Sequence, residues 1–180
     1  MPPEPSFTSL VFDPARHDSA GFDSGQGDLD AWLRTSAATA ARSRVAQTFV
    51  WVGEDHGAQA GRVLAFYALS AHAVARAEAP SRIGRGVPDP VPAALIAKLA
   101  LDRSLQGSGL GAVLLVDALE RILRAGEQGP AVRAIVVDAA TPAGRSLYER
   151  FGFVAAPGRE ERMMVRAETI ARALDSGGQA

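Results

Sequence analysis

A glycine-rich segment at residues 106–111 separates an apolar stretch at 94–101 from a strongly helical stretch at 110–126. The apolar stretch is typical of a buried strand. Glycines at a strand-to-helix junction let the backbone approach a ligand closely, and the first N–H groups of a helix have no acceptors within it. The positive end of the helix dipole adds to this preference for anions. The segment therefore predicts a binding site for a phosphorylated ligand.

Two common phosphate-binding loops do not match this segment. A P-loop needs a Gly-Lys pair, whereas Lys98 is the only lysine of the chain. A dinucleotide-binding loop needs Gly-x-Gly-x-x-Gly close to its strand. Here the glycines are Gly107, Gly109 and Gly111, and residues 102–106 precede them. A helix entry that binds no ligand is the remaining alternative.

The composition limits the class of protein. With 180 residues and 47% hydrophobic residues, the chain is expected to form one domain, 1–180, whose first six residues are flexible. The net charge of −1 excludes a polycation, and the absence of cysteine excludes disulfides and thiolate metal sites. The histidines, His17, His56 and His72, lack metal-ligand spacing. We expect no metal and no membrane span, and a cytoplasmic location.

The order of the predicted elements is mixed. Strands are predicted at 7–12, 47–52, 62–70, 94–101, 132–138, from 153 onward and at 162–166. Helices are predicted from 28 to about 44 and at 110–126, 141–150 and 168–174. A turn is predicted at 53–61, and a long loop with a short helix at 71–92. This order favours an α/β fold with a mixed sheet around a parallel strand–helix–strand centre.

A second motif narrows the phosphorylated ligand. The segment 146–153, Ser-Leu-Tyr-Glu-Arg-Phe-Gly-Phe, resembles the Tyr-x-x-x-Gly-Phe segment after the last helix of the GNAT acetyltransferase superfamily. The spacing Gln106-x-x-Gly109-x-Gly111 resembles the pyrophosphate loop of that superfamily. Looser motifs at 22–33, 67–71, 90–92 and 99–102 resemble one branch, the GNAT toxins of toxin–antitoxin pairs. The resemblance covers roughly residues 20–170 and implies a GNAT fold, with a mixed sheet of six or seven strands and flanking helices.

The resemblance implies acetyl-coenzyme A as the co-substrate. The main chain of Leu99, Ala100 and Leu101 would bind the pantetheine arm like an added strand. The backbone N–H groups of the pyrophosphate loop would hold the diphosphate; its residues are Gln106, Gly107, Ser108, Gly109, Leu110, Gly111 and Ala112. Packing in the core is an equally valid interpretation of Leu99 and Leu101, and it is compatible with main-chain binding.

Tyr148 is the predicted general acid. A phenol with a reference pKa of about 10 stays protonated and can donate to the departing thiolate. The absence of cysteine favours direct attack by an amine in a ternary complex. No general base is evident among His72, Glu149 and Asp138, and an aminoacyl α-amine, less basic than lysine, can be neutral without one. A tyrosine packed on the sheet is the structural alternative for Tyr148.

The toxin branch acetylates aminoacyl-tRNA and so blocks translation, and this is the activity that the resemblance implies. The partners implied are aminoacyl-tRNA, a ribbon–helix–helix antitoxin and a second copy of the chain. A basic rim for RNA would consist of Arg42, Arg44, Arg76, Arg82 and Arg85. Two alternatives stay open: an enzyme that acetylates a protein N-terminus, a lysine or a small amine, and a non-catalytic module that binds acyl-CoA.

Overall fold

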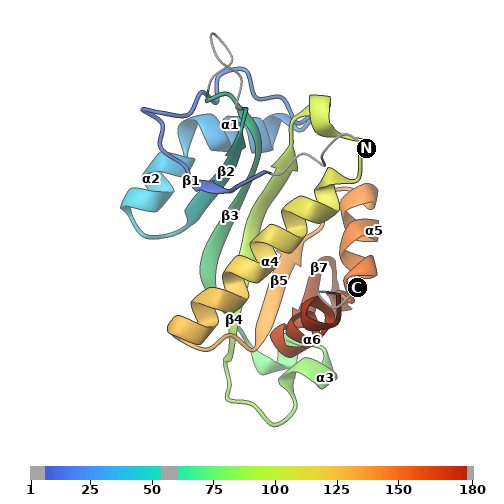
Figure 1. Ribbon diagram of the computed structural model, residues 1–180. Coiled ribbons are helices and arrows are strands. Elements are labelled where there is room, and N and C mark those ends of the chain that lie inside the picture. The colour runs from blue at the N-terminus through green and yellow to red at the C-terminus, as the bar shows by residue number, and fades with distance from the viewer. Residues whose placement is uncertain (1–6, 54–60, 178–180) are drawn as a thin grey trace. The chain divides into compact units, whose positions relative to one another are not determined.

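The computed structural model describes residues 7–53 and 61–177 (Figure 1). The predicted flexible segment 1–6 and all but the ends of the predicted turn at 53–61, His56 included, lie outside these residues. The chain divides into two compact units. The first consists of Met1–Ala68 and Lys98–Asp117, and the second of Leu69–Ala97 and Ala118–Ala180. Three elements belong to both units: β3 (Val63–Val74), β4 (Val91–Leu101) and α4 (Leu110–Gln128).

The chain forms a seven-stranded sheet, in the order β1 (Leu10–Val11), β2 (Gln47–Val52), β3, β4, β5 (Ala134–Asp138), β7 (Arg159–Arg166) and β6 (Val154–Ala156). Strands β4 and β5 are parallel, whereas the pairs β1–β2, β5–β7 and β6–β7 are antiparallel. Helix α4 lies between β4 and β5 in the sequence, so the predicted parallel strand–helix–strand centre is confirmed. The predicted α/β class with a mixed sheet is confirmed as well.

The first unit builds its core from one face of a helix pair and the strands beside it. Its own elements are β1 (Leu10–Val11), α1 (Gly27–Thr35), α2 (Ala37–Arg42), β2 (Gln47–Val52) and the short 3₁₀ helix η2 (Arg103–Leu105). The apolar residues of α1 recur at helical spacing, and Leu33 packs with Phe22 and Phe66 in a buried cluster. The rings of Phe22 and Phe66 meet edge-on, with centroids 5.4 Å apart. This cluster anchors the segment that precedes α1.

The second unit has its core between the sheet and the short helices of the loop that follows β3. Its own elements are η1 (Arg76–Glu78), α3 (Ser81–Gly84), β5 (Ala134–Asp138), α5 (Pro142–Arg150), β6 (Val154–Ala156), β7 (Arg159–Arg166) and α6 (Ala167–Gly177). Ile83 of α3 is buried with Val136 of β5 and Met164 of β7. The register Val136↔Met164 places these two side chains side by side.

Several predicted boundaries are wrong. The helix predicted from 28 to about 44 is two helices that meet at Ser36. The hydroxyl of Thr35 donates to the carbonyl of Ala31 at 2.8 Å, and such bonding back to the preceding turn bends helices. The loop predicted at 71–92 is shorter, because β3 continues to Val74 and β4 already begins at Val91.

Strand β4 begins earlier than predicted because Pro92 is tolerated there. Proline lacks the N–H that a sheet needs, but it is acceptable near the start of a strand. The carbonyl of Pro92 still accepts a hydrogen bond from Arg133 N at 3.0 Å. Strand β1, predicted at 7–12, covers only Leu10–Val11.

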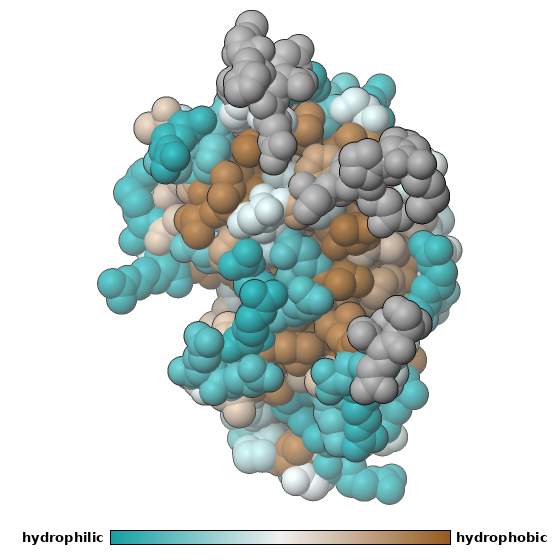
Figure 2. All heavy atoms as spheres, in the orientation of Figure 1, coloured by the Kyte–Doolittle hydropathy of each residue, from teal (hydrophilic) through white to brown (hydrophobic). Residues whose placement is uncertain are grey.

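Some hydrophobic residues are exposed at the surface. In the described part of the chain, the large hydrophobic side chains that are exposed are Leu10, Val11, Val45 and Val113. Figure 2 shows hydrophobic residues reaching the surface between hydrophilic ones on the face drawn there. Of the helices in residues 7–53 and 61–177, none combines the length and apolar character needed to span a bilayer.

A matched pair of valines tests this assignment of the core. Val137 of β5 has no exposed surface, whereas Val11 of β1 is 56% exposed. We expect Val137→Ala to lower the free energy of unfolding by about 2 kcal/mol or more, since it removes buried methyl groups and leaves a cavity. Val11→Ala should change it by less than about 0.5 kcal/mol. Chemical denaturation measures both, and equal losses would contradict this placement of the core.

Candidate active site

The glycine-rich loop has a backbone that only glycine adopts easily. Gly107 and Gly109 have φ angles of 77° and 81°, in the left-handed region. A Cβ atom added at either glycine would meet no other atom within 4 Å, so the space beside the loop is open. Glycine is therefore required here by the backbone conformation and not by crowding.

The N–H groups at residues 107–111 form the anion-binding feature of this loop. Within residues 7–53 and 61–177, no protein atom accepts a hydrogen bond from these five groups, whereas Ala112 N donates to the carbonyl of Gly109 at 3.1 Å. Residues 106–109 are exposed, and Leu110, Gly111 and Ala112 are half-buried. Free N–H groups at the start of the 19-residue helix α4 suit a phosphate ligand.

The strand before the loop places the predicted pantetheine-binding residues. Leu99 and Leu101 are half-buried and Ala100 is buried, at the end of β4. The carbonyl of Leu101 already accepts a hydrogen bond from the side-chain Nε2 of Gln106 at 3.0 Å. The Gln106 side chain is thus engaged with the protein.

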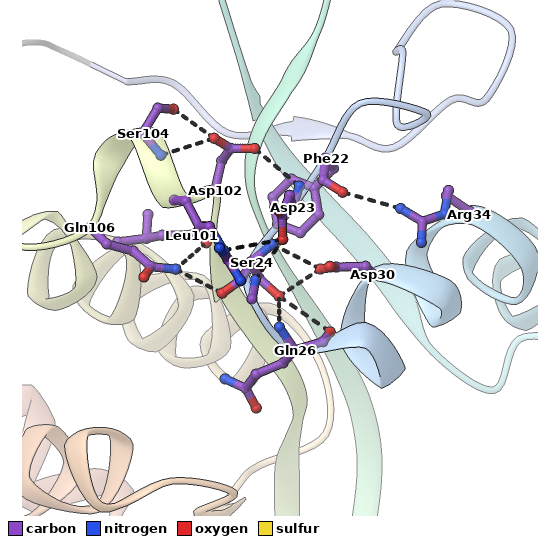
Figure 3. A network of polar contacts seen from close by, with 12 residues as sticks. Phe22, Asp23, Ser24, Gln26, Asp30, Arg34, Leu101, Asp102, Ser104 and Gln106 are labelled. Atoms are coloured by element: carbon purple, nitrogen blue, oxygen red, sulfur yellow. Dashed lines mark hydrogen bonds and ion pairs between the residues drawn. The ribbon is translucent and has the colours of Figure 1, made fainter.

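A polar network, which the sequence did not predict, joins this loop to the turn before α1 (Figure 3). Asp102, which is 3% exposed, accepts hydrogen bonds from Ser104 and from the backbone of Asp23. Ser24 and Asp30 are likewise buried, and the hydroxyl of Ser24 donates to Asp30 at 2.6 Å. In the sequence, Asp102 and residues 22–30 belong to motifs that resemble a family. Nothing in the sequence indicates that these two segments contact each other.

In the second unit, Tyr148 lies on the buried side of helix α5. Thr141 caps the helix by accepting a hydrogen bond from Gly144 N at 3.1 Å, and Pro142 begins it. Tyr148 is 8% exposed, and its ring packs against Phe153 with the centroids 5.7 Å apart. Gly152, with φ of 82°, ends the helix and turns the chain toward Phe153. In the described residues, no group hydrogen-bonds the Tyr148 hydroxyl.

The surroundings of Tyr148 keep its hydroxyl protonated. Burial, with a further contribution from the negative charge of Asp138, raises the pKa of Tyr148 to about 12. The phenol therefore has a proton to donate throughout the physiological pH range.

The three candidate bases named from the sequence are each engaged by an arginine. Arg162 binds Asp138 through both carboxylate oxygens at 2.9 Å, which is the main reason that the pKa of Asp138 is lowered. Nη1 of Arg162 also lies 3.4 Å from His72 Nε2. Glu149 pairs with Arg145 at 3.0 Å on the surface.

The contact with Arg162 defines the state of His72. Because a guanidinium can only donate, Nε2 accepts, and the neutral ring carries its proton on Nδ1. Burial and then the charge of Arg162 lower the pKa of His72, which fits this neutral form. The ring nitrogen that could take a proton is thus already occupied, so this contact disfavours His72 as a general base.

The predicted RNA-binding arginines are exposed. Arg42 ends α2 and donates to Thr39 Oγ1 at 2.9 Å, and Arg44 follows it. Arg76, Arg82 and Arg85 lie in the second unit, in and around η1 and α3. The described residues contain no group of three or more histidine or acidic side chains that could bind a metal ion.

Comparisons with known proteins agree with the two motifs. A family model described as the acetyltransferase (GNAT) domain matches residues 46–155. A tRNA-acetylating toxin of Mycobacterium tuberculosis is 40% identical over 140 residues, which cover 78% of this chain and 80% of the relative.

Two solved structures share the fold. The toxin AtaT complexed with acetyl-methionyl-tRNAfMet has a TM-score of 0.82 and 23% identity, and covers 94% of this chain and 99% of its own. A mutant of AtaT bound to the C-terminus of the antitoxin AtaR and acetyl-CoA has a TM-score of 0.77 and 20% identity, with 93% and 98% covered. The match of the family model and the 40% identity to the toxin together show that this chain belongs to the GNAT acetyltransferase family.

Proposed function

We propose that this protein is a toxin that transfers the acetyl group of acetyl-CoA to the amino group of aminoacyl-tRNA and so blocks translation. The observation that carries the proposal is the 40% identity to a tRNA-acetylating toxin over most of both chains. The open loop at the start of α4 and the protonated Tyr148 supply the chemistry that such a transfer needs.

The first unit supplies the groups for binding acetyl-CoA. The N–H groups at 107–111 have no protein acceptor in the described chain, and the helix dipole behind them favours negative charge. They suit the pyrophosphate, with Gln106 and Ala112 at the two ends of the loop. The end of β4, with Leu99, Ala100 and Leu101, suits the amides of the pantetheine arm. Acetyl-CoA supplies an activated thioester as the acetyl donor.

Tyr148 acts as the general acid in this proposal. The amine nitrogen forms a bond to the acetyl carbon, the carbon–sulfur bond breaks, and the phenol gives its proton to the departing sulfur. The amide nitrogen then loses a proton, which restores the phenol through solvent. Since His72, Glu149 and Asp138 are all paired with arginines, the amine enters in its neutral form without a dedicated base.

The exposed arginines Arg42, Arg44, Arg76, Arg82 and Arg85 contact the phosphates of the tRNA, which makes its affinity strongly salt-dependent. A ribbon–helix–helix antitoxin holds the toxin inactive. The protein acts in the cytoplasm as a single domain and assembles as a homodimer.

Radiolabelled acetyl transfer tests the proposed activity directly. Wild-type protein is incubated with labelled acetyl-CoA and total aminoacyl-tRNA, and deacylated tRNA and free amino acids serve as controls. We expect label on the charged tRNA alone, and mild alkaline hydrolysis should release it as N-acetyl amino acids. Label on lysines, protein N-termini or small amines would favour the second kind of acetyltransferase. Calorimetry that detects no binding of acetyl-CoA would favour a non-catalytic module.

Tyr148→Phe tests the role of the phenol. Without the acid the thiolate must leave unprotonated, so we expect kcat to fall about 10²- to 10⁴-fold. The dissociation constant for acetyl-CoA should be unchanged, because the ring and its packing against Phe153 remain. Tyr67→Phe, the same change at the only other tyrosine, is the matched control. Full activity in Tyr148→Phe would overturn the assignment of the acid.

The pH dependence tests the state of the phenol. An ordinary tyrosine is half-ionised near pH ~10, whereas burial and Asp138 raise the pKa of Tyr148 to about 12. We expect the ultraviolet difference spectrum between wild type and Tyr148→Phe to show no tyrosinate at pH ~10. Asp138→Asn removes a negative charge and should lower the pKa of Tyr148. An unshifted titration near pH ~10 would contradict the described environment.

A further inference from the structure

The turn at residues 22–26 and the segment 102–106 are about eighty residues apart in the sequence but are joined by several polar contacts (Figure 3). Asp23 N donates to Asp102 Oδ2 at 3.1 Å, and Arg103 N donates to the carbonyl of Asp23 at 2.8 Å. Gln106 Nε2 donates to the carbonyl of Ser24 at 2.9 Å. We call these contacts the loop clamp, because the segment 102–106 leads directly into the free N–H groups at 107–111.

Asp102 is the charged centre of the loop clamp. Its two oxygens accept from Asp23 N, from Ser104 N and Oγ, and from the guanidinium of Arg62 at 3.2 Å. Burial by itself would raise the pKa of Asp102, but the hydrogen bonds from Ser104 and Asp23 and the charge of Arg62 outweigh it and lower the pKa. The carboxylate is therefore ionised, and its partners come from three segments of the chain: Asp23, Arg62 and Ser104.

Gln106 forms the second side of the loop clamp. Its amide nitrogen donates to two carbonyls, of Ser24 and of Leu101 at the end of β4. Ser24 is itself fixed, since its N and Oγ both donate to the buried Asp30 of α1. A chain of hydrogen bonds thus links Asp30 of α1, through Ser24, to Gln106, which is the first residue of the pyrophosphate loop.

The turn at 22–26 leaves room for the side chain of Arg103 because residue 25 is a glycine. Gly25 has φ of 81°, and a Cβ atom there would lie 3.1 Å from Nε of Arg103. The guanidinium of Arg103 also pairs with Asp23 at 3.4 Å, although both side chains are well exposed. A side chain at Gly25 would therefore displace Arg103, which follows Asp102.

We propose that Asp102 and Gln106 are positioning residues that hold the N–H groups at 107–111 in the geometry that recognises a pyrophosphate. This inference rests on the proposed role of the loop in binding acetyl-CoA. Neither side chain touches the ligand. Asp102 fixes the entry to the loop and Gln106 fixes its first residue, so that the glycines, which have no side-chain contacts of their own, keep one conformation.

Two acetyl donors separate positioning from general stability. Acetyl-CoA contains the pyrophosphate, whereas S-acetylpantetheine offers the same thioester and arm without it. For the near-isosteric variants Asp102→Asn and Gln106→Met, we expect kcat/KM for acetyl transfer from acetyl-CoA to fall about 10- to 100-fold, as misplaced binding groups do. The value for S-acetylpantetheine should stay as in wild type. Asp28→Asn, the same change at an exposed aspartate of α1, should alter neither value.

The outcomes distinguish this inference from the proposed function. If the wild type prefers acetyl-CoA and both variants keep that preference, or lose activity with both donors equally, the positioning role is wrong while the site stands. If the wild type uses no acetyl-CoA, the proposed function fails as well. Gln106 is exposed, so Gln106→Met should fold even if Asp102→Asn does not. Calorimetry with coenzyme A, which needs no acceptor, should show the same loss of affinity in each folded variant.

Discussion

The backbone N–H groups at the start of α4 are the feature on which the proposed binding of acetyl-CoA depends. In the described residues these five consecutive N–H groups have no protein acceptor, and because residues 107–109 are exposed, the groups are open to water or to a ligand. The positive φ angles of Gly107 and Gly109 turn the loop into this arrangement, and the long helix behind it adds its dipole. The diphosphate of acetyl-CoA, which we propose as the ligand, would match both the hydrogen bonds and the charge.

The second unit supplies a different kind of preorganisation. Tyr148 is buried beside Phe153 near the carboxylate of Asp138, and both burial and charge keep its proton in place. Arg162 holds Asp138 and His72, which leaves no free base among these residues. Such a site suits an acceptor whose amine is already neutral, as the α-amine of an aminoacyl ester can be, better than a strongly basic lysine.

The sequence predicted the parts of the fold that depend on local patterns. Helix α4 followed from its helical periodicity, strand β4 followed from an apolar stretch, and the loop between them followed from its glycines. The break at Ser36 was missed because it depends on the hydroxyl of Thr35 bonding to the preceding turn. The extension of β3 to Val74 was missed because alanines at 71 and 73 carry little strand propensity, and pairing in the sheet decided the outcome.

The candidate site was predictable only where residues lie together in the sequence. The loop at 106–112 and Tyr148 were proposed from motifs, and their roles stay predictions. The contacts of Asp102 with Arg62 and Asp23, and of Arg162 with Asp138 and His72, join distant segments, and no spacing in the sequence indicates them. Their roles became visible only when the strands and the turn were placed.

The most direct test of the central claim is the response of individual amides to coenzyme A. In ¹⁵N-labelled protein, NMR spectra recorded during a titration report each N–H group separately. We expect the N–H resonances of residues 107–111 to shift downfield, as hydrogen bonds to phosphate form, and pantetheine to leave them in place. Unchanged resonances at these residues, with the largest shifts elsewhere in the protein, would contradict this claim.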